Sequence, residues 1–178
     1  DEFGGGDVND VKHLMDYLPK LEQQLNLSLQ NETMFLLGGS RGGMEMFLAL
    51  GRFPELQNRF KKIVSLSGLL DMPACIAGRR DMKEMFMTDF GLIENANEEQ
   101  WIAERNPILM ADKMRTDLPI LIIQGTEDNR VGLEEGYHMV SQLQAHGCAV
   151  TYWEIEGGEH CLVNLDDRVP QIMQWLEE

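Results

Sequence analysis

A short apolar run, residues 34–37, leads straight into a serine that stands between glycines. Gly38, Ser40 and Gly42 form the Gly-x-Ser-x-Gly pattern of a nucleophile elbow, in which a serine sits on a sharp strand-to-helix turn. Such a turn leaves little room for side chains two residues before and after the serine, so we expect Gly38 and Gly42 to be required there. The pattern predicts a serine whose hydroxyl attacks a carbonyl carbon.

Two phosphate-binding glycine motifs do not fit this segment. A P-loop needs Gly-Lys-Ser/Thr, and a dinucleotide-binding loop needs a glycine where Ser40 stands. A glycine-rich turn with an incidental serine is the simplest alternative when the five residues are taken alone. In a nucleophile elbow Arg41 would be the first residue of the following helix, and its backbone N–H is the expected donor to an oxyanion.

A serine hydroxyl is a weak nucleophile, so the elbow also predicts a histidine base and a carboxylate that orients it, in the order Ser, Asp or Glu, His. Asp128 follows the apolar run 118–124, and His160 follows a second predicted strand within a glycine loop. In parallel sheets ligands bind outside the carboxyl ends of the strands. We therefore expect Ser40, Asp128 and His160 to form a hydrogen-bonded row at one edge of a sheet.

The acid and the base both have alternatives. Glu127 is the neighbour of Asp128, and Asp71 follows another predicted strand, residues 62–67, where a triad acid could also stand. Asp128 is favoured because its loop directly precedes the helix and strand that lead to His160. As for the base, His160 could be an ordinary loop residue. The other histidines all fall on predicted helices: His13, His138 and His146.

Five segments, in this order, resemble the prolyl oligopeptidase family of serine peptidases within the α/β-hydrolase superfamily. They are the opening residues 1–11, the elbow 38–43, the stretch 105–108, the acid loop 125–131 and the histidine loop 158–160. The resemblance implies that Ser40, Asp128 and His160 are a catalytic triad and that peptide bonds are the substrate. It also implies that Arg130 holds a substrate carbonyl, for which a guanidinium is well suited; a surface arginine that offsets nearby acids is the alternative.

Two features depart from the family pattern. Family members place several strands and an oxyanion-hole loop before the region where this chain starts, whereas 39 residues precede Ser40 here. Arg41 is then the one oxyanion donor expected within the chain, and we expect the segment by itself to be poorly active. The nucleophile strand should form an open sheet edge that associates with an upstream domain or a second copy. In addition, Cys161 stands where a glycine often follows the histidine.

The composition is that of one acidic domain. The chain has 178 residues, of which 43% are hydrophobic, and this is enough for a single core. Thirty acidic and fifteen basic residues give a net charge of −15, which argues against nucleic acids and anionic membranes as partners and favours neutral or cationic substrates. No apolar run has the length of a membrane span, and the polar start does not resemble a signal peptide.

Cysteine usage is consistent with a reducing compartment. The three cysteines are an odd number without metal-ligand spacing: Cys75, Cys148 and Cys161. They favour the cytoplasm over an oxidising compartment, and no metal or other cofactor is expected.

Residues 71–113 interrupt the alternation of strands and helices. The segment is rich in methionine, at positions Met72, Met82, Met85, Met87 and Met110, with Met114 just beyond. Helices from this segment could line a substrate pocket with adaptable apolar side chains, or their methionines could simply pack in the core.

Together these observations predict the C-terminal half of an α/β-hydrolase domain over residues 1–178, with a parallel sheet and helices on both faces. The expected strands are residues 33–37, 63–67, 119–124 and 150–155. The expected reaction is acyl transfer to water, most simply on a peptide. Hydrolysis of a small carboxylic ester is one alternative, and a catalytically silent interaction module is another.

Overall fold

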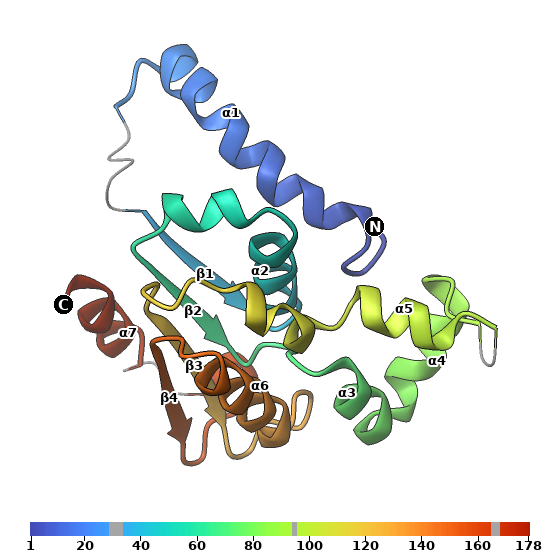
Figure 1. Cartoon of the computed structure of the whole chain (residues 1–178). Coiled ribbons are helices and arrows are strands. Elements are labelled where there is room, and N and C mark those ends of the chain that lie inside the picture. Colours follow the sequence, from blue (N-terminus) through green and yellow to red (C-terminus); the bar gives the residue numbers. More distant parts are fainter. Residues whose placement is uncertain (29–33, 94–95, 165–167) are drawn as a thin grey trace.

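The computed structural model describes residues 1–28, 34–93, 96–164 and 168–178 (Figure 1). Four strands form one parallel sheet in the order β1-β2-β3-β4, which agrees with the predicted fold class. The strands are β1 (Phe35–Gly39), β2 (Lys62–Leu66), β3 (Ile120–Gly125) and β4 (Val150–Ile155). The predicted bounds are correct for β4 and differ by one or two residues for the others, and residue 33 lies outside the described residues.

Helices connect the strands and surround the sheet. The α-helices are α1 (Asn9–Leu25), α2 (Arg41–Arg52), α3 (Met72–Gly78), α4 (Arg80–Asp89), α5 (Glu98–Glu104), α6 (Leu133–Ala145) and α7 (Arg168–Glu177). Short 3-10 helices are η1 (Gly6–Val8), η3 (Pro54–Arg59), η4 (Pro107–Lys113) and η5 (His160–Leu162). Figure 1 shows α3, α4 and α5 as a helical lobe at one side of the sheet, inserted between β2 and β3.

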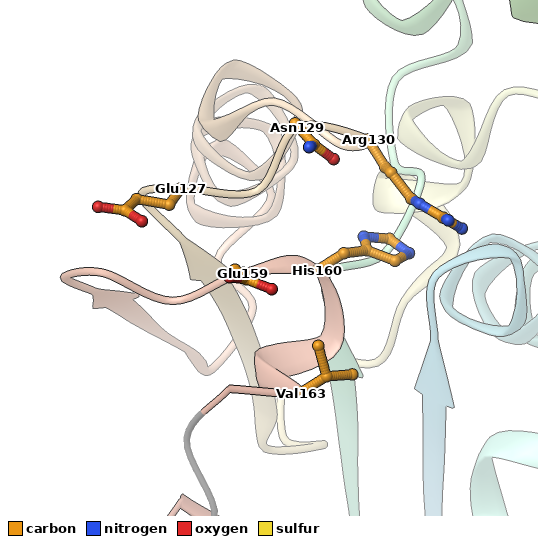
Figure 2. A pocket seen from close by; sticks show the side chains of 6 residues that line it. All are labelled: Glu127, Asn129, Arg130, Glu159, His160 and Val163. Atoms are coloured by element: carbon orange, nitrogen blue, oxygen red, sulfur yellow. The ribbon is translucent and has the colours of Figure 1, made fainter.

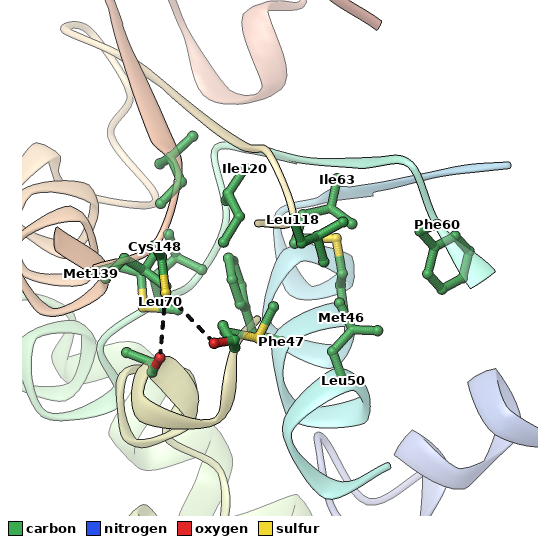
Figure 3. Packing of buried hydrophobic residues seen from close by; sticks show 14 of the residues in the cluster. Met46, Phe47, Leu50, Phe60, Ile63, Leu70, Leu118, Ile120, Met139 and Cys148 are labelled. Carbon is green, nitrogen blue, oxygen red and sulfur yellow. Dashed lines mark hydrogen bonds between the residues drawn. The ribbon is translucent and has the colours of Figure 1, made fainter. Parts of the chain in front are cut away.

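The sheet is covered on both faces, and its central strands β2 and β3 are mostly apolar. Ile120 and Ile122 of β3 pack with α2, η4 and α6, where Phe47 is completely buried (Figure 3). Leu121 and Ile123 point to the opposite face and pack against α7. This alternation follows from the two-residue period of a strand, and coverage of both faces is what a parallel sheet requires.

The cysteines contribute to packing, and all three are free. Cys148 lies in the cluster between the sheet and α6, with its Sγ 3.9 Å from the Ala111 carbonyl oxygen and 3.8 Å from that of Met114 (Figure 3). Cys75 is buried in α3. Within the described ranges no group of three or more potential ligands is placed to hold a metal ion.

A separate apolar cluster joins the helical lobe to the start of the chain. Phe3 packs edge-on against Phe86, with 4.9 Å between ring centroids, and Trp101 completes the aromatic group. Met72 and Met110 are buried in this cluster, as the core interpretation predicted. The methionines of the lobe do not share a single role, because Met82 and Met85 line a cavity beside Ser40.

β1 is the last strand of the sheet on its side. Among the described residues it pairs with β2 alone, so the open edge predicted from the sequence is present. Phe35 and Leu37 of this strand are 37% and 51% exposed, which is unusual for large apolar side chains on a parallel strand. No helix in the described part of the chain is long and apolar enough to cross a membrane.

Candidate active site

Ser40 occupies a strained turn between β1 and α2. Its backbone has φ 53° and ψ −122°, a conformation that non-glycine residues rarely adopt and that is often found at functional sites. A Cβ at Gly38 would lie 2.3 Å from the carbonyl oxygen of Gly42, so Gly38 is required as predicted. The expectation for Gly42 is wrong, because a Cβ there would meet nothing within 4 Å. The second close approach is at Gly43, where a Cβ would lie 2.8 Å from the Cα of Gly68.

The structure brings Ser40, His160 and Asp128 into one hydrogen-bonded row. Nε2 of His160 lies 2.9 Å from Oγ of Ser40, and Nδ1 lies 2.8 Å from Oδ2 of Asp128. The Asp128 side chain is fully buried and that of His160 is 16% exposed. The imidazole thus contacts the hydroxyl with one nitrogen and a carboxylate with the other, which is the geometry a serine nucleophile and its base require.

The carboxylate of Asp128 is held by backbone donors as well as by His160. Its Oδ1 accepts hydrogen bonds from the backbone N–H groups of Arg130, at 2.8 Å, and Val131, at 3.0 Å. These bonds fix the carboxylate plane, so that it orients the imidazole. Glu127, the neighbouring alternative, is exposed, and its side chain points away from His160 in Figure 2.

Asp71, the other candidate acid, belongs to a different group of residues. It caps α3 by accepting a hydrogen bond from the backbone N–H of Ala74 at 3.3 Å. Its Oδ2 lies 2.7 Å from Nδ1 of His138, on α6. Both of its carboxylate oxygens are therefore engaged with α3 and α6, and His160 is paired with Asp128 instead.

The loops that carry the acid and the histidine are packed backbone to backbone. A Cβ at Gly125 would lie 2.1 Å from the carbonyl oxygen of Gly158, and one at Gly158 would lie 3.0 Å from the Cα of Gly125. The backbone N–H of Glu127 donates to the same Gly158 carbonyl at 2.9 Å. The sequence shows a glycine in each loop but gives no sign that they face each other.

Ser67 is a further residue of the site that the sequence analysis missed. It directly follows β2, is completely buried, and its Oγ accepts a hydrogen bond from the backbone N–H of Cys161 at 3.0 Å. Its position at the carboxyl end of a strand could have indicated it.

Cys161, the residue after the histidine, has φ 53°, the left-handed conformation that suits the glycine common at this position. Burial, and secondarily the charge of Asp128, raises the pKa of the Cys161 thiol, so the thiol stays protonated at neutral pH.

Arg41 is the first residue of α2 and follows Ser40 directly. The first N–H groups of an α-helix have no acceptor within the helix, so the Arg41 N–H is available at the elbow. The positive end of the α2 dipole lies at the same place. This is a suitable position for negative charge that develops beside Ser40.

Two larger cavities lie beside Ser40 and His160, and a smaller one, of about 140 Å³, lies beside Asp128. The cavity beside Ser40, of about 440 Å³, is lined by five apolar side chains and three arginines: Phe3, Leu69, Met82, Met85, Val131, Arg41, Arg79 and Arg130. The other, of about 590 Å³, lies beside His160 and is lined by polar residues that include Glu127, Asn129 and Glu159 (Figure 2).

Arg130 lines both cavities. Figure 2 shows its side chain extending past His160. In the described residues its guanidinium has no hydrogen bond or ion pair, which leaves its donors available to another molecule.

The sequence is similar to those of known peptidases. The model of the prolyl oligopeptidase family matches residues 1–178. Dipeptidyl peptidase family member 6 of Caenorhabditis elegans is 30% identical over 155 residues, which are 84% of this chain and 20% of that protein. The uncharacterized peptidase YtmA of Bacillus subtilis is 25% identical over 182 residues, which are 99% of this chain and 65% of that protein.

Solved structures show the same fold. The uncomplexed acylaminoacyl peptidase of Pyrococcus horikoshii superposes with a TM-score of 0.81 at 21% identity, covering 99% of this chain and 28% of that one. The carboxylesterase Cest-2923 of Lactobacillus plantarum superposes with a TM-score of 0.66 at 16% identity, covering 96% and 66%.

The fold is that of the α/β hydrolases, and the matches indicate the class of serine hydrolases or peptidases. Within that class, the chain belongs to the prolyl oligopeptidase family, which confirms the resemblance seen in the sequence. The chain spans about a fifth to two thirds of the length of these two relatives.

Proposed function

We propose that residues 1–178 are part of an α/β-hydrolase catalytic domain and supply the catalytic triad of a serine peptidase. The observation that carries the proposal is the row of Ser40, His160 and Asp128, with 2.9 Å and 2.8 Å between the paired atoms. Three strands bring these side chains together at the edge of the sheet where ligands bind in this type of fold.

In the proposed reaction, Oγ of Ser40 attacks the scissile carbonyl carbon while Nε2 of His160 takes the hydroxyl proton. Asp128 accepts a hydrogen bond from the Nδ1–H of the imidazole and stabilises the positive charge of the ring. The imidazolium then gives its proton to the leaving amine as the C–N bond breaks, which leaves an acyl-enzyme on Ser40. Water, activated by His160, attacks this ester, releases the acid and restores the serine.

Negative charge on the carbonyl oxygen is stabilised by the Arg41 N–H at the start of α2. Arg130 is proposed to donate to a substrate carbonyl near the scissile bond. Its position between the two cavities, and a guanidinium without a partner among the described residues, support this role over that of a surface arginine that offsets acids. A fixed fork of donors can hold such a carbonyl in one orientation.

The two cavities suit the two halves of a substrate. The apolar cavity beside Ser40 is placed for the acyl half, and the polar cavity beside His160 for the leaving half, because His160 protonates the leaving group. A net charge of −15 favours neutral or cationic substrates. Family membership and relatives named as peptidases support a peptide substrate.

Hydrolysis of a carboxylic ester is the second candidate function. The same row can attack an ester carbonyl, and a carboxylesterase shares the fold. A module without catalytic activity would keep the fold but have no reactive serine.

Fluorophosphonate labelling of the chain, with Ser40→Ala as control, separates these possibilities. We expect covalent labelling of the parent and none of the variant, because an activated serine is needed to attack phosphorus. Rates on matched aminoacyl amides and esters then distinguish peptidase from esterase: efficient ester hydrolysis with no detectable amide hydrolysis would identify an esterase. A parent chain that is not labelled would contradict the proposal.

A further inference from the structure

The first seven residues fold back over the start of α2 and reach the cavity beside Ser40. Phe3 is 7% exposed and lines that cavity. Its ring packs edge-on against Phe86 and Phe90 of the helical lobe, with centroid distances of 4.9 and 5.2 Å. One side of the cavity is therefore an aromatic ring that is held by two others.

Asp7 fixes the backbone on both sides of Phe3. Its Oδ1 accepts a hydrogen bond from the N–H of Gly4 at 3.1 Å, and its Oδ2 accepts one from the N–H of Glu2 at 3.2 Å. The Asp7 side chain is 16% exposed. These bonds hold Phe3 in a left-handed conformation, φ 49°, that an unrestrained phenylalanine rarely adopts.

Arg41 connects this loop to the nucleophile. Its guanidinium is hydrogen-bonded to Asp7, to Asp1 at 2.6 and 2.8 Å and to Glu45 at 2.6 Å. It also lies over the ring of Phe3, 4.7 Å from the centroid. The residue next to Ser40 thus contacts both Phe3 and its anchor, and three carboxylates offset its charge.

Another part of the cavity wall is built differently. Met82 and Met85 of α4 line it, and methionine side chains are unbranched and adapt to irregular shapes. Phe3 is restrained by the bonds of Asp7, by two aromatic neighbours and by the Arg41 guanidinium. A rigid wall rejects groups that are too large, whereas a flexible wall rearranges around them.

We propose that Phe3 determines which acyl side chains the cavity beside Ser40 admits, and that Asp7 and Arg41 are positioning residues that hold it. The selected side chains are apolar, because Phe3 and four other apolar residues line the cavity. Of the three arginines that also line it, Arg41 and Arg79 are paired with carboxylates, and Arg130 is the residue proposed to bind a substrate carbonyl. The inference rests on the proposed function, since it takes Ser40 as the residue that is acylated. It assigns specificity to the opening loop, which is far from the acid loop in the sequence.

The test uses the p-nitrophenyl esters of N-acetyl-alanine, N-acetyl-leucine and N-acetyl-phenylalanine. Their activated leaving group permits measurement at low turnover, and ratios of kcat/KM within one variant cancel its absolute rate. Phe3→Ala enlarges the cavity and should raise the phenylalanine-to-alanine ratio about tenfold, the effect typical of a small change in an apolar pocket. Phe3→Trp should lower that ratio, and it also serves if Phe3→Ala does not fold.

Phe60→Ala is the matched control for Phe3. Phe60 is a buried phenylalanine of another core cluster and does not line the cavity, so its loss should lower stability and leave the ratio unchanged. Asp7→Asn should raise KM more than it lowers kcat and should change the ratio in the direction of Phe3→Ala. Asp10→Asn is its control, because Asp10 is a nearby acid in the first turn of α1 and is 85% exposed.

Failure of the proposed function and failure of the specificity proposal give different results. A parent chain that fluorophosphonate does not label contradicts the proposed function, and with it this inference. If the parent is labelled at Ser40 but neither Phe3→Ala nor Phe3→Trp changes the ratio by more than about twofold, Phe3 is a packing residue and the specificity proposal is wrong while the proposed function stands.

Discussion

Gly125 and Gly158 lie so close that a Cβ on the first would meet the carbonyl oxygen of the second at 2.1 Å. This contact sets the distance between the loop that carries Asp128 and the loop that carries His160. Because the position of a Cβ is fixed by the backbone and its partner is a backbone oxygen, no side-chain rotation could relieve such a clash. The hydrogen bond between acid and histidine therefore depends on two residues without side chains.

Gly125→Ala should separate these loops. We expect it to lower the free energy of unfolding by about 1–3 kcal/mol, the usual cost of overpacking, and to lower fluorophosphonate labelling of Ser40. Urea unfolding and labelling rates measure the two effects. Gly78→Ala is the control, since a Cβ at Gly78 meets nothing within 4 Å. Equal behaviour of the two variants would mean that the loop contact is unimportant.

The proposed triad predicts non-additive losses. Ser40→Ala and His160→Ala should each lower kcat by several orders of magnitude, and the double variant should be no worse than either, because the residues act as a unit. Asp128→Asn should also be severe, whereas Asp71→Asn should be mild for catalysis because Asp71 pairs with His138. The choice of acid is wrong if the order of these two asparagine variants is reversed.

We expect the Ser67 hydroxyl to position the loop that carries His160, an effect that can be separated from the packing of β2. Ser67→Ala removes the acceptor of the Cys161 N–H, and the histidine loop should then hold His160 less firmly. We expect kcat to fall by about tenfold, a cost of the size of one hydrogen bond. Ser65→Ala, in β2, is the control, because in the described structure the buried Ser65 hydroxyl has no hydrogen-bond partner. A loss of kcat in both variants would indicate strand packing as the cause.

Glu135 predicts a pH-dependent stability. It is 2% exposed, accepts hydrogen bonds from the N–H groups of Leu70 and Asp71, and has a pKa raised to about 8, chiefly by burial. The unfolded-state pKa is about 4.3, so between these values the folded chain holds a proton that the unfolded chain has lost. Stability should therefore fall as the pH rises from about 5 to 8, by at most about 1.4 kcal/mol per pH unit from this group.

Glu135→Gln should remove this part of the slope and stabilise the chain at pH 8. Other titratable groups lie near Glu135, namely Asp71, Glu134, Cys75 and His138. Glu134→Gln is therefore the control, because it removes one acidic charge next to Glu135 and leaves Glu135 in place. Urea unfolding at pH 5, 6, 7 and 8 measures both variants. A slope in Glu135→Gln as steep as that of the parent would show that other groups titrate.

The open edge of β1 predicts association. Exposed ladder groups and the half-exposed Leu37 should drive the 178-residue chain into dimers or larger species. Leu37→Lys should shift sedimentation toward the monomer, because a charged side chain on an edge opposes pairing. Leu109→Lys is the control, since Leu109 is equally exposed, at 50%, but lies in η4. A monodisperse parent monomer would contradict this prediction.

Much of the site was predictable because its signals are local. An apolar run that ends in glycine marks the end of a strand, and Ser40, Asp128 and His160 each follow such an end in the sequence. Parallel topology then brings those ends to one edge, whatever the intervening segments do. The fold class, the elbow and the order of the row follow from this reasoning without knowledge of any distance.

The rest depends on contacts between segments far apart in the chain. Ser67 and Cys161 are 94 positions apart, and nothing near either residue indicates the hydrogen bond between them. A side chain is excluded at Gly43 rather than at Gly42, because the backbone of Gly68, which follows a different strand, lies against Gly43. The sequence by itself determined which residues stand at the ends of the strands. Only the tertiary structure decided that Gly125 would meet Gly158 and that Phe3 would line the cavity, because packing depends on shapes that meet after the chain has folded.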